Sequence, residues 1–123
     1  ARMIEANPHL STAMARHLTI HGIMRLEDGS YVWKFDNYVR AWPPQRYDEL
    51  GVQRLWSLVR CPVLLVRGGE SWASNPVADG RATHFQNAEY VEVEGAGHWV
   101  HHDRFDVFMR HLLTFLGADD GRP

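Results

Sequence analysis

The sequence has few of the features that would direct a chain out of the cytoplasm. Its single cysteine, Cys61, excludes an internal disulfide and a zinc site built from several cysteines. The longest wholly apolar run is VLLV, which is far too short to cross a bilayer. No cationic stretch leads into an apolar one at the N-terminus, so we expect no secretory signal. These absences predict a cytoplasmic protein that does not bind a membrane.

Charge of one sign is also scarce, because 13 basic and 15 acidic residues leave a formal net charge of -2. A chain without a basic field is not expected to bind nucleic acid. Its 123 residues suffice for one domain with a core of its own. The chain starts with Ala1, inside a helical pattern, which suggests that it is part of a longer protein.

The first part of the sequence predicts a helix, a hairpin and a second helix. Ser11 is a suitable N-cap for a helix that ends near Gly22, where we expect a left-handed C-cap. The pair Asp28-Gly29, between alternating apolar residues, indicates a β-hairpin. Asp36 is suited to cap a short helix that runs to Trp42 and stops at two prolines.

The second part alternates between helices and strands. We expect helices over 47–58 and 103–116, and a further helix capped by Asn75 with Pro76 at its first position. The run CPVLLVRGG is typical of a strand buried on both faces, and EYVEVE, residues 89–94, predicts a second strand. This order indicates an α/β fold with a parallel sheet, and we expect the boundary with the first part between residues 43 and 58.

Two segments of the second part resemble the C-terminal end of an α/β-hydrolase: LVRCPVLLVRGGES and FQNAEYVEVEGAGHWVHHDRFDVFMRHLLTFL. The resemblance covers about residues 57–116 and implies the C-terminal part of the hydrolase's parallel sheet with its flanking helices. It further implies that residues 1–56 are part of a cap, or lid, and that residues 117–123 form a polar tail.

The same resemblance implies site residues. His98, in a Gly-x-Gly-His turn, would be the general base, and Gly95 and Gly97 would keep the turn tight. The family's usual acid position is occupied by Ser71, so Glu70, one residue earlier, becomes the candidate acid, unless the acid follows the preceding strand. The nucleophile, serine or aspartate, would lie upstream of Ala1, and the 123 residues alone would be inactive.

The activity implied is hydrolysis of a small or medium apolar substrate, an ester first of all, and no cofactor is implied. An alternative is a hydrolase-like interaction module without catalysis, which the serine at the acid position favours. Two further interpretations of the site are weaker. GESWA resembles a nucleophile elbow at Ser71, but the following helix begins too late. A metal site would need His98, His101, His102 and Asp103 to converge, whereas Asp103 is better used as a helix cap.

Two patterns are expected to be structural. Glu89, Glu92 and Glu94 lie along the second strand and predict a solvated face or edge. The apolar stripe on the last helix predicts core packing, and it consists of Phe105, Phe108, Met109, Leu112 and Leu116. Trp99 either lines the pocket or packs under this helix.

Overall fold

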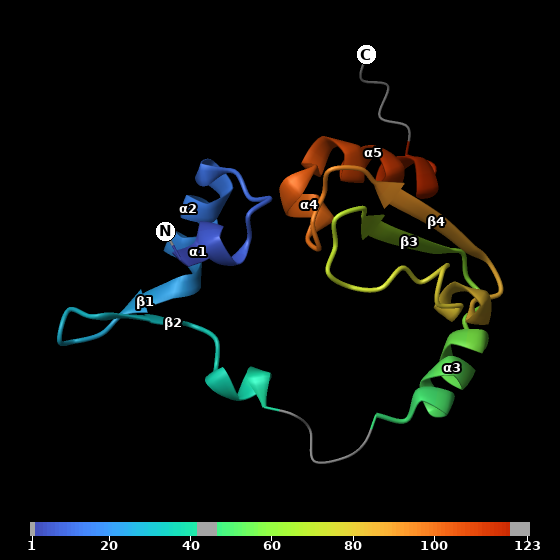
Figure 1. Cartoon of the computed structure of the whole chain (residues 1–123), viewed down its shortest axis with the longest axis horizontal. Helices are drawn as coiled ribbons and strands as arrows, with labels where there is room; N and C mark the ends of the chain where they lie inside the picture. Colours follow the sequence, from blue (N-terminus) through green and yellow to red (C-terminus); the bar gives the residue numbers. More distant parts are fainter. Residues whose placement is uncertain (1, 42–46, 119–123) are drawn as a thin grey trace. The chain divides into compact units, whose positions relative to one another are not determined.

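The computed structural model describes residues 2–41 and 47–118, and it divides into two compact units, Ala1–Tyr47 and Asp48–Pro123 (Figure 1). The second unit starts inside the boundary region expected between residues 43 and 58, and it includes the helix expected over 47–58. The interpretation of residues 1–56 as a cap stays a prediction.

The first unit contains two helices, a hairpin and a 3-10 helix: α1 (Arg2–Ala6), α2 (Thr12–Gly22), β1 (Ile23–Arg25), β2 (Tyr31–Trp33) and η1 (Asn37–Arg40). The predicted cap of α2 is confirmed, since Ser11 Oγ accepts the Met14 N–H at 3.1 Å. The predicted hairpin is also confirmed, with β1 and β2 antiparallel and Gly29 in the left-handed region at φ 83°.

Two details of the first unit differ from expectation. Gly22 is the last residue of α2 and not a left-handed cap, because the chain passes directly into extended Ile23 and β1. Asp36 does cap a short helix, through a 2.9 Å hydrogen bond from the Tyr38 N–H, but η1 ends at Arg40. The predicted end at Trp42 and the two prolines lie outside the described residues.

The second unit contains a parallel pair of strands flanked by helices: α3 (Glu49–Ser57), β3 (Val63–Gly68), η2 (Arg81–His84), β4 (Ala88–Val93), α4 (Val100–Asp103) and α5 (Phe105–Phe115). β3 and β4 pair in parallel from Val63 opposite Ala88 to Gly68 opposite Val93, as predicted (Figure 1). The two strands therefore end side by side, and the loops that follow them leave from the same edge.

Two predicted helices of this unit are wrong in part. Asn75 Oδ1 accepts the N–H groups of Val77 and Ala78, as a cap would, but only turns and the 3-10 helix η2 follow. Gly80, at φ 84°, takes the left-handed conformation and interrupts the helix after one turn. The helix expected over 103–116 is α5, which starts at Phe105 without a side-chain cap, while Asp103 ends the separate turn α4 and accepts the Gly97 N–H instead of capping a helix.

The core of the second unit lies between the parallel strands and the last two helices. Val93, Ala96 and Val100 are buried there, and Val66, Val91, Val107 and Phe108 pack against them. Each buried valine contributes about 1.5–3 kcal/mol relative to an exposed one. The predicted stripe of the last helix is core only in part, since Phe105 and Leu116 are exposed. Within the described ranges, the structure contains no helix long and apolar enough to cross a membrane.

Candidate functional site

The loops after β3 and β4 are held together by backbone hydrogen bonds. Gly69 N–H donates to Val93 O at 2.9 Å, and Glu70 N–H donates to Ala96 O at 3.0 Å. Glycine is required at the end of β3, because a Cβ on Gly68 would collide with the backbone of Ala96 and Gly97. The loop that carries residues 70–74 is thus packed directly against the turn that carries His98.

The turn before His98 is tight and anchored at its base. Gly95 lies in the left-handed region at φ 65°, and Ala96 is completely buried. The N–H of buried Gly97 donates to Asp103 Oδ2 at 2.8 Å, which ties the turn to the end of α4. The imidazole of His98 is exposed and lies beyond the carboxyl ends of both strands, where open α/β sheets place their ligands.

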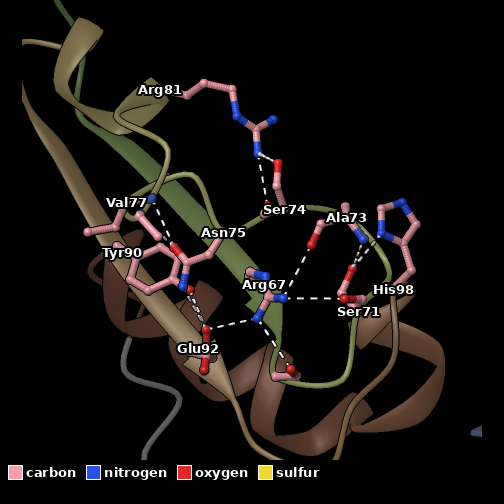
Figure 2. A network of polar contacts seen from close by, with 12 residues as sticks. Arg67, Ser71, Ala73, Ser74, Asn75, Val77, Arg81, Tyr90, Glu92 and His98 are labelled. Carbon is pink, nitrogen blue, oxygen red and sulfur yellow. Dashed lines mark hydrogen bonds and ion pairs between the residues drawn. The ribbon is translucent and has the colours of Figure 1, made fainter.

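Ser71 is the residue that meets His98. Its Oγ lies 2.9 Å from His98 Nδ1 and also accepts the N–H of Ala73 at 3.1 Å (Figure 2). Nδ1 is the nitrogen to which the acid of a Ser-His-Asp triad bonds. The hydroxyl therefore stands at the position of that acid, and it leaves Nε2 on the opposite side of the ring for proton transfer.

Two tryptophans flank the same ring. The indole of Trp72 lies 4.2 Å from the imidazole between centroids, at an interplanar angle of 33°, and Trp99 meets it edge-on at 5.8 Å. Trp72 is 79% exposed and Trp99 44%, so Trp99 is not packed under the helices.

The remaining candidates lie around this pair. Glu70 is exposed on the loop, and its assignment as the acid stays a prediction. The chain after Ser71 forms bends and turns rather than a helix, so the geometry of a nucleophile elbow is not present. His101 and His102 lie together, with ring centroids 4.1 Å apart, and Asp103 is engaged with Gly97. In the part of the chain that the structure describes, no three His, Cys, Asp or Glu side chains are grouped as a metal site.

A polar network lies behind the loop and was missed in the sequence. Arg67 of β3 donates to Glu92 Oε2 of β4 at 2.9 Å, and Glu92 also accepts from Tyr90 Oη at 2.6 Å (Figure 2). The hydrogen bond from Tyr90 and the charge of Arg67 lower the pKa of Glu92. Burial and the Glu92 carboxylate raise the pKa of Tyr90. Glu89, Glu92 and Glu94 are all exposed, as predicted, and Glu92 is in addition an ion-pair partner.

A second ion pair braces the far end of the loop. Arg81 Nε lies 2.9 Å from Asp79 Oδ2, and its Nη2 donates to Ser74 O at 2.9 Å. The hydrogen bonds from Arg81 and Ser74 lower the pKa of Asp79 to about 2. A pocket of about 400 Å³ lies along β3 in this unit, and both Ser71 and His98 line it.

Solved structures share the fold of this chain. A structure of the Mycobacterium tuberculosis esterase Rv0045c matches with a TM-score of 0.78 and 26% identity, over 94% of this chain and 39% of that one. E-2-(acetamidomethylene)succinate hydrolase matches with a TM-score of 0.74 over 95% of this chain and 43% of that one; at 18% identity it shows the fold alone. The chain belongs to the α/β-hydrolase fold family, with the architecture of the C-terminal part of that fold.

Two esterases are similar to this chain in sequence. Esterase Rv0045c of Mycobacterium tuberculosis is 32% identical over 105 residues, which is 82% of this chain and 33% of that protein. Esterase YbfF of Escherichia coli is 27% identical over 110 residues, or 84% of this chain and 41% of that protein. The chain therefore spans about one third to two fifths of the length of these relatives. No family model matches it.

Proposed function

We propose that the protein to which this chain belongs hydrolyses carboxylic esters of small or medium apolar substrates, with His98 as the general base. The observation that carries the proposal is the 2.9 Å contact between Ser71 Oγ and His98 Nδ1 at the carboxyl ends of two parallel strands. That contact orients the ring for proton transfer at Nε2. The esterase activity named for both relatives supports the choice of an ester.

In the proposed reaction His98 acts as general base in two successive steps, acylation of the enzyme and its deacylation. His98 Nε2 takes the proton of a serine hydroxyl supplied by a part of the protein outside residues 1–123, and that serine attacks the ester carbonyl. The tetrahedral intermediate collapses when His98 returns the proton to the leaving alkoxide, and an acyl-enzyme remains. His98 then deprotonates water, which attacks the acyl group, and the proton passes back to the serine as the acid is released.

Ser71 orients the ring but cannot balance its charge. A hydroxyl is neutral, so the imidazolium that forms in each half-reaction needs a carboxylate elsewhere. Glu70 is the candidate within this chain, as a neighbour of Ser71 on the same loop.

The test is the kinetics of the full-length protein with p-nitrophenyl esters of increasing acyl length. His98→Ala should lower kcat/KM by at least about 10³-fold, as loss of a catalytic base does in serine hydrolases. The matched control is His101→Ala, an exposed histidine three residues along, which should retain activity within about 3-fold. Full turnover in the His98 variant would refute the proposal.

A second candidate function is a hydrolase-fold interaction module without catalysis. A specific observation favours it, because the residue that meets Nδ1 is a hydroxyl where the mechanism requires a negative charge nearby. Absence of saturable turnover in the full-length protein, across the ester series and with equal background for His98→Ala, would support the module.

A further inference from the structure

Arg67 is a charged residue in an otherwise apolar strand, and its ion pair alone does not explain why an arginine occupies this position. It is the charged residue of the strand VLLVRG, and its side chain is only 16% exposed. Its Nε is buried without a hydrogen-bond partner among the described residues. Its partner Glu92 is 44% exposed, and ion pairs of such exposure add little to stability, so an apolar residue would serve the strand at least as well. The hydrogen bonds that the guanidinium donates to the following loop are therefore a better explanation for the arginine than its ion pair with Glu92.

What it holds is the backbone of the loop that carries Ser71. Nη1 donates to Gly69 O at 3.3 Å, and Nη2 donates to Ser71 O at 3.3 Å and to Ala73 O at 3.2 Å (Figure 2). The three acceptors are alternate residues, so the loop wraps around one planar cation. Ser71 is fixed at both ends as a result: Arg67 binds its carbonyl, while Ala73 and His98 bind its hydroxyl.

The cation is itself held in place from the neighbouring strand. Arg67 and Glu92 are direct partners in the parallel register, and Nη1 lies 2.9 Å from Glu92 Oε2. Tyr90 and Asn75 donate to the same oxygen, at 2.6 and 3.1 Å. Asn75 closes the loop at its other end, so both ends of the segment 69–75 are attached to one network.

From this geometry we propose that Arg67 is a positioning residue for His98: its guanidinium holds the loop so that the Ser71 hydroxyl fixes the orientation of the imidazole. The inference rests on the proposed function, since it assumes that the orientation of His98 matters for turnover. Lysine is not an equivalent residue, because an ammonium is a point charge and lacks the planar fork that spans several acceptors.

The first test is Arg67→Lys in the full-length protein, with the same esters. The variant keeps the charge opposite Glu92 and loses the fork, so kcat should fall by about 10- to 100-fold, as expected for a small misplacement of a catalytic group. KM should change by less than about 3-fold, because a misoriented general base slows the chemical step and leaves ground-state binding unchanged. The matched control is Arg110→Lys, since Arg110 is exposed on α5, and its kcat should change by less than about 2-fold.

A double-mutant cycle separates positioning from a structural role. If Arg67 acts through Ser71, Ser71→Ala already removes the contact with Nδ1, and adding Arg67→Lys should lower kcat by less than about 2-fold more. If the fold-losses in kcat of Arg67→Lys and Ser71→Ala multiply in the double variant, the inference is overturned. Should Arg67→Lys fail to fold, the neutral pair Arg67→Gln with Glu92→Gln replaces it, since neutral substitutes for a buried ion pair are commonly tolerated. Unchanged kcat in the folded neutral pair would equally overturn the inference.

Failure of this inference is distinguishable from failure of the proposed function. If only the inference fails, His98→Ala abolishes turnover while the Arg67 variants behave like the Arg110 control. If the proposed function fails, His98→Ala has no effect either.

Discussion

Gly68→Ala is the substitution that bears most directly on how the strand and the His98 turn fit together. A Cβ at Gly68 would lie 2.8 Å from the carbonyl carbon of Ala96, and closer still to the carbonyl oxygens of Ala96 and Gly97. Ordinary van der Waals contact begins at 3.4 Å, so the turn must move by roughly 1 Å or more to make room. Overpacking of this kind costs about 1–3 kcal/mol of folding free energy.

The catalytic cost should exceed the stability cost. A displacement of about 1 Å in a catalytic group lowers the rate about 100-fold, so kcat of the full-length Gly68→Ala variant should fall by that order while the protein remains folded. The assay pairs urea unfolding with ester kinetics. The matched control is Gly69→Ala, because a Cβ there meets its nearest atom at 3.6 Å and should be tolerated. A Gly68→Ala protein with wild-type kcat would refute the reasoning.

Two further predictions concern side chains that brace the site. Asp103→Ala should lower the free energy of unfolding by roughly 1–3 kcal/mol, because it leaves the buried Gly97 N–H without its acceptor, while Asp103→Asn keeps an acceptor and should cost less than about 1 kcal/mol; urea denaturation would measure both, and equal costs would contradict the role of this bond. Asp79 has its pKa lowered to about 2 from 3.8, so its stabilising contribution is present above pH 3.8 and is lost as the pH falls through about 2. The thermal midpoint of Asp79→Asn should accordingly lie below the wild-type value at pH 5 and converge with it near pH 2, and a gap independent of pH would contradict this.

The elements predicted correctly are those with local signals. The hairpin follows from Asp28-Gly29, because few sequences accept a positive φ at that place in a turn. The cap of α2 follows from Ser11, and β3 and β4 follow from their apolar and β-branched runs. His98 was found through a resemblance of its turn to a known family, not through periodicity.

The elements predicted wrongly depend on contacts between distant residues. Asp103 was expected to cap the last helix, but its carboxylate accepts the N–H of Gly97, and α5 starts at Phe105 without a side-chain cap. The local sequence does not show whether the carboxylate accepts from the helix or from the turn before it. Arg67 carried a usable signal, as a charge inside an otherwise apolar strand, yet its partner Glu92 is 25 residues away and becomes visible only with the parallel register.

The contact between Ser71 and His98 Nδ1 was likewise not predictable from the sequence. The two residues are 27 positions apart, and the sequence suggested only that Ser71 stands where an acid is usual. The approach of the two loops depends on Gly68, whose missing side chain lets the backbone of Ala96 and Gly97 come close. The glycine at position 68 was the clue in the sequence, because a glycine at the end of a strand can indicate that another segment of backbone lies against it.

The most direct test of the central claim is to label the full-length protein with a fluorophosphonate and map the modified residue by mass spectrometry. We expect one labelled serine outside residues 1–123, with labelling lost in His98→Ala, because His98 serves as its base. Label on Ser71 would contradict the proposed roles, since Ser71 would then be a nucleophile and not the residue that orients His98. Labelling that persists without His98 would contradict them as well.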